Sequence, residues 1–161
     1  MAPRRPARLR SFSYRGKYQY YVTFCTFERR DFFTRTEVVD PVRAQFLQTF
    51  QEREFALLAA VFMPDHVHLL IEGLSDDADF KGTMMVARQR WTMAFKQRVA
   101  TPSLWQDAYF ERVLRREDQV HTTASYIVEN PVRAGLAEKP EEYPYVWSRF
   151  HPALKRLRDG T

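Results

Sequence analysis

Residues 55–72 read FALLAAVFMPDHVHLLIE. The apolar run Phe55–Met63 and the run Val67–Glu72 each have the length of a β-strand. Between them stand Pro64 and Asp65, a pair of residues that is typical of turns. The stretch therefore predicts a β-hairpin, and the remaining elements can be ordered around it.

One strand and one helix are expected before the hairpin. Tyr18–Phe27 is rich in aromatic and β-branched residues and is apolar on both faces, which indicates a central strand. Asp40 followed by Pro41 is a good helix start, with Asp as N-cap and Pro at the first helical position. Apolar residues then recur at helical spacing, so this helix should run to about Arg53.

Two helices and a strand are expected after the hairpin. An apolar stripe marks a long helix over roughly Asp79–Val99, and Phe110–Val113 is a candidate strand. Asp118 can cap a third helix, which should end near Asn130-Pro131 because a residue before proline resists the helical conformation. The order β-α-β-β-α-β predicts an α+β, ferredoxin-like split βαβ fold with two helices on one face of an antiparallel sheet, and the C-terminal helix is extra.

The composition is that of one globular domain, which we place at residues 18–150. Of the 161 residues, 45% are hydrophobic and 28% are charged. The longest apolar runs, such as Ala56–Met63, are far shorter than the ~20 residues of a membrane span. No apolar segment follows the basic N-terminus, so we expect no secretory signal. The single cysteine, Cys25, argues against a disulfide framework or a multi-cysteine zinc site and fits the cytoplasm.

Positive charge is concentrated at the two ends of the chain. The net charge is +5, residues 1–20 hold six basic residues and no acid, and residues 145–161 hold four basic residues and one acid. Basic ends of this kind are expected of arms that bind a polyanion, although they are also common as solubilising tails. We therefore predict a basic N-terminal arm over residues 1–17 and a basic C-terminal tail over residues 151–161.

His66 and His68 stand two residues apart in a predicted strand. Strand side chains alternate between faces, so both imidazoles should point the same way, about 7 Å apart along the strand. A pair placed in this way can share one divalent metal ion, with Asp65 as a possible further ligand or simply a turn residue. The alternative is a pair of polar histidines on an exposed strand face.

Tyr126 and Asn130 stand four residues apart on the predicted third helix. That spacing puts a phenol and an amide one above the other, beside the stripe to which Ile127 belongs. A deprotonated tyrosine is a nucleophile, although its ordinary pKa of about 10 favours the neutral form. The alternative is an ordinary tyrosine that packs its ring on the flank of a helix.

Several of these segments resemble one family. The segment MPDHVHLLI at 63–71 is similar to the HUH motif (histidine, hydrophobic residue, histidine) of single-domain tyrosine transposases. The blocks at 105–106 (WQ), 109–115 (YFERVLR), 126–136 (YIVENPVRAGL) and 143–148 (YPYVWS) resemble one branch of that family. The branch is the REP-associated tyrosine transposases, which are linked to bacterial repetitive extragenic palindromes.

The resemblance covers the chain from about Tyr18 to Trp147 and implies roles for individual residues. His66 and His68 would bind Mg²⁺ or Mn²⁺, and Tyr126 would be the nucleophile. Asn130 would be the third metal ligand, with Glu129 as the alternative.

The resemblance also implies a reaction and a substrate. The enzyme would cut single-stranded DNA beside a palindromic hairpin through a 5′-phosphotyrosine, without ATP, in the cytoplasm at the nucleoid and as a monomer or homodimer. The arginines of the N-terminal arm would bind this DNA: Arg4, Arg5, Arg8 and Arg10. Trp105 and Tyr109 are candidates for stacking on bases, whereas Trp91 lies on the core stripe. A catalytically inactive DNA-binding protein or repressor of palindromic elements, and a purely structural interaction protein, are the alternatives.

Overall fold

The computed structural model describes residues 11–154 of the chain. Within them lie five strands and three α-helices: β1 (Gln19–Cys25), α1 (Thr36–Glu52), β2 (Phe55–Met63), β3 (His66–Gly73), α2 (Phe80–Lys96), β4 (Phe110–Leu114), α3 (Glu117–Arg133) and β5 (Val146–Ser148). Short 3₁₀ turns add Phe27–Arg29, Pro140–Glu142 and Pro152–Leu154. No helix in this part of the chain is long and apolar enough to cross a membrane.

The strands form one sheet in the order β4-β1-β3-β2-β5, and each neighbouring pair is antiparallel. The first four strands have the order of a ferredoxin-like sheet, so the predicted α+β fold is confirmed. β1 lies between β4 and β3, as expected for a strand that is apolar on both faces. The edge strand β5 was not predicted, because three residues are too few to give a recognisable alternation.

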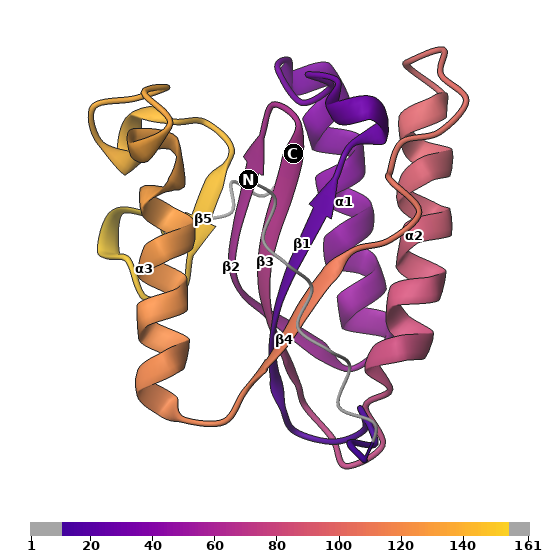
Figure 1. Cartoon of the computed structure of the whole chain (residues 1–161), viewed down its shortest axis with the longest axis vertical. Helices are drawn as coiled ribbons and strands as arrows, with labels where there is room; N and C mark the ends of the chain where they lie inside the picture. The colour runs from indigo at the N-terminus through magenta and orange to yellow at the C-terminus, as the bar shows by residue number, and fades with distance from the viewer. Residues whose placement is uncertain (1–10, 155–161) are drawn as a thin grey trace.

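Helices α1 and α2 cover one face of the sheet and α3 covers the other (Figure 1). On the first face Trp91 of α2 is fully buried, and its ring lies 3.5 Å from that of Phe46 of α1, centroid to centroid. On the second face Ile127 of α3 packs in a smaller cluster with Val61 of β2 and Leu70 of β3. The main core is therefore separate from the face on which α3 lies.

Helix α1 begins at Thr36, five residues before the predicted first helical residue Pro41, so the expected cap at Asp40 is wrong. Val38 and Val39 are buried, and their backbone N–H groups bond to the carbonyl of Arg35 at 3.1 and 3.0 Å. Pro41 lies inside the helix, where it lacks only the one N–H that would reach back a turn. The burial of the two valines compensates for that lost hydrogen bond. The periodicity of apolar residues in the sequence did not reveal this burial.

Helix α3 also continues past its predicted end. It passes through Pro131, which is buried, and ends at Arg133. Gly135 then takes a left-handed conformation with φ 73°, and the N–H of Leu136 bonds to the carbonyl of Pro131 at 2.9 Å. This is a glycine-terminated helix end, so Gly135 rather than Pro131 stops the helix.

Part of the predicted N-terminal arm is packed on the domain. Tyr14 is buried, its ring stacks on those of Tyr20 and Phe80, and the N–H of Gly16 bonds to the carbonyl of Ala78 at 3.0 Å. In the predicted C-terminal tail, Leu154 is buried. The remainder of both predicted arms, residues 1–10 and 155–161, lies outside the described residues.

Candidate active site

The two histidines of β3 lie on the face of the sheet that carries α3. Their neighbours Val67 and Leu69 belong to the opposite core, as strand alternation requires. The imidazole rings of His66 and His68 are 4.7 Å apart, centroid to centroid, and both line the same cleft. The expected shared face is confirmed, and the two rings lie closer together than the expected spacing of about 7 Å along the strand.

Hydrogen bonds occupy the Nδ1 atom of each histidine. His66 Nδ1 lies 2.7 Å from a carboxylate oxygen of Asp65. His68 Nδ1 lies 2.7 Å from the Thr23 hydroxyl and 3.0 Å from the Tyr21 hydroxyl. An ionised carboxylate can only accept a hydrogen, so His66 carries its proton on Nδ1 and its lone pair on Nε2. Such partners fix the orientation of histidines that bind metal ions.

Both histidines are neutral at physiological pH. Burial lowers the pKa of His68 from 6.5 to about 3, and the neighbouring His66, Arg133 and Arg29 lower it further. Burial also lowers the pKa of His66, although Asp65 acts in the opposite direction. The contact between Asp65 and His66 is thus a hydrogen bond from a neutral imidazole, and the pair is in the protonation state that binds metal ions.

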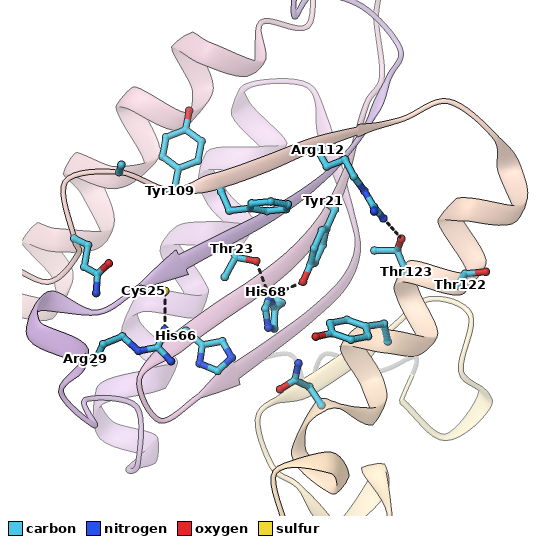
Figure 2. Close-up of a pocket in the computed structure, with 15 residues that line it drawn as sticks. Tyr21, Thr23, Cys25, Arg29, His66, His68, Tyr109, Arg112, Thr122 and Thr123 are labelled. Atoms are coloured by element: carbon cyan, nitrogen blue, oxygen red, sulfur yellow. Dashed lines mark hydrogen bonds between the residues drawn. The ribbon is translucent and has the colours of Figure 1, made fainter. Parts of the chain in front are cut away.

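Tyr126 of α3 lines the same cleft as His66 and His68, which are labelled in Figure 2. Its side chain is 49% exposed, and its ring lies 6.1 Å from the ring of His68 and 6.4 Å from that of Tyr21, centroid to centroid. The guanidinium of Arg133 lies over the ring at 4.0 Å and donates to the backbone carbonyl of Tyr126 at 2.5 Å. This contact holds the phenol ring beside the cleft while the residue stays half exposed.

Asn130 lines the same cleft one helical turn after Tyr126. Glu129, the alternative ligand, is exposed and does not line the cleft. The helix therefore presents an amide rather than a carboxylate to the paired histidines.

The cleft has a volume of ≈ 900 Å³, and its walls come from β1, β3, β4, α3 and the segments that join them. Arg29 and Arg112 supply positive charge along it. Arg112 extends from β4 and contacts the hydroxyl of Thr123 at 3.5 Å. An open cleft with arginines on its walls can accept an extended anionic chain.

Two imidazoles and one amide are the donor groups that this cleft offers to a divalent cation. Among residues 11–154 no group of three or more His, Cys, Asp or Glu side chains is suited to a metal ion. His66, His68 and the amide of Asn130 nevertheless face one cleft, and hydrogen bonds orient the histidines. Asp65 contacts His66 and Arg29 through its two oxygens, so both oxygens of its carboxylate already have partners.

The structure separates the three aromatic residues that were considered for base stacking. Trp91 is fully buried, as predicted. Trp105 is also buried, against Phe24 and other core rings, so this candidate is not available to stack on bases. Tyr109 is half-buried and lines the cleft. The four arginines predicted to bind DNA (Arg4, Arg5, Arg8 and Arg10) lie outside the described residues.

Sequence reasoning missed five residues of the site: Tyr21, Thr23, Arg29, Arg112 and Arg133. Thr23 is the direct partner of His68 across the β1–β3 ladder. That pairing was the one signal that could have revealed Tyr21 and Thr23, because both lie on the face of β1 that alternation assigns to the histidines.

Comparison with known proteins gives the family. Residues 14–130 match the family described as "Transposase IS200 like", and the chain belongs to this family. A REP-associated tyrosine transposase of Escherichia coli is 24% identical over 115 residues, which cover 71% of this chain and 66% of that protein. A Haemophilus influenzae protein assigned to the same class is 25% identical over 130 residues, covering 74% of this chain and 73% of that protein.

Solved structures agree in fold. A REP-associated tyrosine transposase bound to a REP hairpin matches with a TM-score of 0.73 and 20% identity, over 91% of this chain and 84% of that one. A Deinococcus radiodurans protein described as a transposase matches with a TM-score of 0.54 and 20% identity, over 75% and 94% of the two chains. The resemblance to REP-associated tyrosine transposases is confirmed, and with it the class of enzyme, transposases that cut and rejoin DNA.

Proposed function

We propose that this chain is a metal-dependent endonuclease and strand transferase that acts on single-stranded DNA at palindromic hairpins through a tyrosine nucleophile. The observation that carries the proposal is the shared cleft of Tyr126, the two histidines and Asn130, which come from α3 and β3. A binding protein without chemistry has no need of a half-exposed phenol beside two neutral imidazoles.

Tyr126 is the nucleophile in this proposal. Its phenolate oxygen attacks the phosphorus of one phosphodiester, and its proton passes to water because the side chain is half exposed. The bond from phosphorus to the 3′ oxygen breaks, and that oxygen leaves as a 3′-OH after taking up a proton. The products are a 5′-phosphotyrosine and a free 3′ end. Attack by a 3′-OH on the phosphotyrosine reverses these steps and rejoins DNA without ATP.

His66, His68 and Asn130 would hold Mg²⁺ or Mn²⁺. When bound, such an ion polarises the phosphate and offsets the charge that develops on it. Thr23, Tyr21 and Asp65 keep the two imidazoles in their binding orientation. The metal site is in this way built mainly from one strand and its direct neighbours.

The proposed substrate is a DNA hairpin with a single-stranded flank. The solved relative that is bound to a REP hairpin supports this choice. We propose that the basic arm over residues 1–17, through Arg4, Arg5, Arg8 and Arg10, contacts phosphates of the stem, while Arg29 and Arg112 face the strand in the cleft. A monomer or a homodimer is compatible with one nucleophile per chain, which cuts one strand at a time.

The test uses a 5′- or 3′-labelled hairpin oligonucleotide with single-stranded flanks, incubated with the full chain and Mn²⁺ and run on a denaturing gel. The 3′ label should appear in a protein–DNA adduct, and the 5′ label should appear in a shortened free strand. A shift on a native gel without an adduct would instead indicate a DNA-binding protein or repressor. The absence of both an adduct and a shift would favour a structural interaction protein.

A further inference from the structure

The segment that follows β1 places an arginine beside the metal-site histidines in an uncommon backbone conformation. Glu28 and Arg29 both have left-handed φ angles, 54° and 55°. Residues other than glycine rarely adopt this conformation, and two in succession persist only where surrounding contacts hold them. Such strain is concentrated at functional sites. The side chain of Arg29 contacts Asp65, which in turn contacts His66 of the candidate active site.

Arg29 reaches back across the end of β1 to the hairpin turn (Figure 2). One terminal nitrogen lies 2.9 Å from Oδ2 of Asp65, and the other donates to Sγ of Cys25 at 2.8 Å. The other oxygen of Asp65 accepts from His66 Nδ1 at 2.7 Å. Arg29, Asp65 and His66 therefore form one continuous chain of charge-assisted contacts.

The same segment also holds the backbone of the turn. The N–H and hydroxyl of Thr26 both donate to the carbonyl of Asp65 at 3.0 Å, and the N–H of Phe33 donates to the carbonyl of Pro64 at 3.0 Å. The turn would thus keep its path without the arginine side chain. The side chain of Arg29 instead fixes the orientation of the Asp65 carboxylate.

We propose that Arg29 is a positioning residue for the metal ligand His66. By binding one oxygen of Asp65, it directs the other to His66 Nδ1 and keeps the imidazole proton there. The Nε2 lone pair then faces the cleft in every molecule. The inference rests on the proposed function, because it assumes that His66 binds the metal ion.

The test compares two substitutions with a matched control. Arg29→Gln removes the charge, and Arg29→Gly removes the side chain while placing glycine where φ is positive, so this variant should fold at least as stably. Arg30→Gln is the control, since Arg30 lies in the same segment but pairs with Glu28 rather than Asp65. Mn²⁺ affinity, measured by the EPR signal of the free ion, should fall about tenfold in both Arg29 variants and stay unchanged in Arg30→Gln.

Two further readouts isolate the route through Asp65. In metal-free protein, ¹⁵N NMR should find His66 protonated at Nδ1 in the wild type and a mixture of tautomers in Arg29→Gln. The losses of Mn²⁺ affinity in Arg29→Gln and Asp65→Asn should be less than additive in the double variant. Wild-type affinity in Arg29→Gln, an unchanged tautomer or additive losses would overturn the inference.

His66→Ala distinguishes this failure from failure of the proposed function. If His66→Ala weakens Mn²⁺ binding and Arg29→Gln does not, the positioning role alone is wrong. If His66→Ala binds Mn²⁺ like the wild type, the metal site and the positioning role are both wrong.

Discussion

The ring of Tyr126 lies 6.1 Å from the ring of His68, centroid to centroid, although one residue belongs to α3 and the other to the central part of the sheet. The extra helix of the fold thus brings a phenol to a pair of histidines that the ferredoxin-like sheet supplies.

Removal of either histidine should abolish Mn²⁺-dependent cleavage and weaken Mn²⁺ binding by at least about tenfold. The two variants should differ in stability. His68 is only 7% exposed, so His68→Ala should lower the free energy of unfolding by about 1–3 kcal/mol. His66→Ala should lower it by less, because His66 is more accessible. Titration with Mn²⁺ and urea unfolding check the two effects separately. Cleavage at the wild-type rate by His68→Ala with Mg²⁺ would rule out the assigned site.

Loss of the Thr23 hydroxyl should weaken the metal site without touching a ligand. Thr23→Val keeps the shape of the side chain but removes the closest partner of His68 Nδ1. We expect Mn²⁺ affinity to fall by about tenfold, since supporting hydrogen bonds of this kind are worth 10–100-fold or so in affinity. Thr122→Val is the control, because Thr122 lines the cleft from α3 and bonds to the helix carbonyl of Asp118. Equal losses in both variants would speak against a specific role for Thr23.

The metal-free protein should lose stability as the pH falls from 7 to 5. The folded protein holds the pKa of His68 at about 3, below the ordinary 6.5, so the unfolded chain takes up a proton in this range and the folded protein does not. Stability tied to this group is full above pH 6.5 and declines as the pH falls toward 3. The decline should reach about 2 kcal/mol by pH 5. Urea midpoints in EDTA measure it.

His68→Gln provides the comparison for this pH effect. The variant has no imidazole at this position, so its unfolding free energy should change less between pH 7 and 5. Parallel pH dependence in the wild type and His68→Gln would show that another group is responsible.

Deletion of residues 1–10 should weaken hairpin binding and make it less sensitive to salt. The deletion removes four arginines and no acid but keeps the packed Tyr14. The slope of log K against log salt should become shallower by up to about three to four, at 0.7–0.9 or so per phosphate contact. Cleavage at saturating protein should persist. An unchanged slope, measured by fluorescence anisotropy at several salt concentrations, would mean that this arm does not touch phosphate.

The sequence predicted the hairpin and the position of both histidines because strand alternation is a local property. The same holds for Tyr126 and Asn130, whose relation follows from helical spacing. The start of α1 was missed because it depends on the burial of Val38 and Val39 by other elements.

The supporting residues of the site were missed for a different reason. Thr23 reaches His68 through the pairing of β1 with β3, and Arg29 reaches Asp65 through two left-handed residues in succession. Neither the register of a sheet nor a strained turn leaves a periodic signal in the chain. The strand that carries the two histidines was therefore predictable, whereas the residues that orient these histidines were not.

The most direct test of the proposed mechanism is the identity of the residue that becomes joined to DNA. Tyr126→Phe removes one oxygen and keeps the ring, so hairpin binding and stability should stay near wild type while adduct and cleavage disappear together. Tyr109→Phe is the matched control, because Tyr109 also lines the cleft. Peptide mass mapping of the wild-type adduct should find the nucleotide on Tyr126. An adduct on another tyrosine, or strand cleavage by Tyr126→Phe with no adduct at all, would contradict the mechanism.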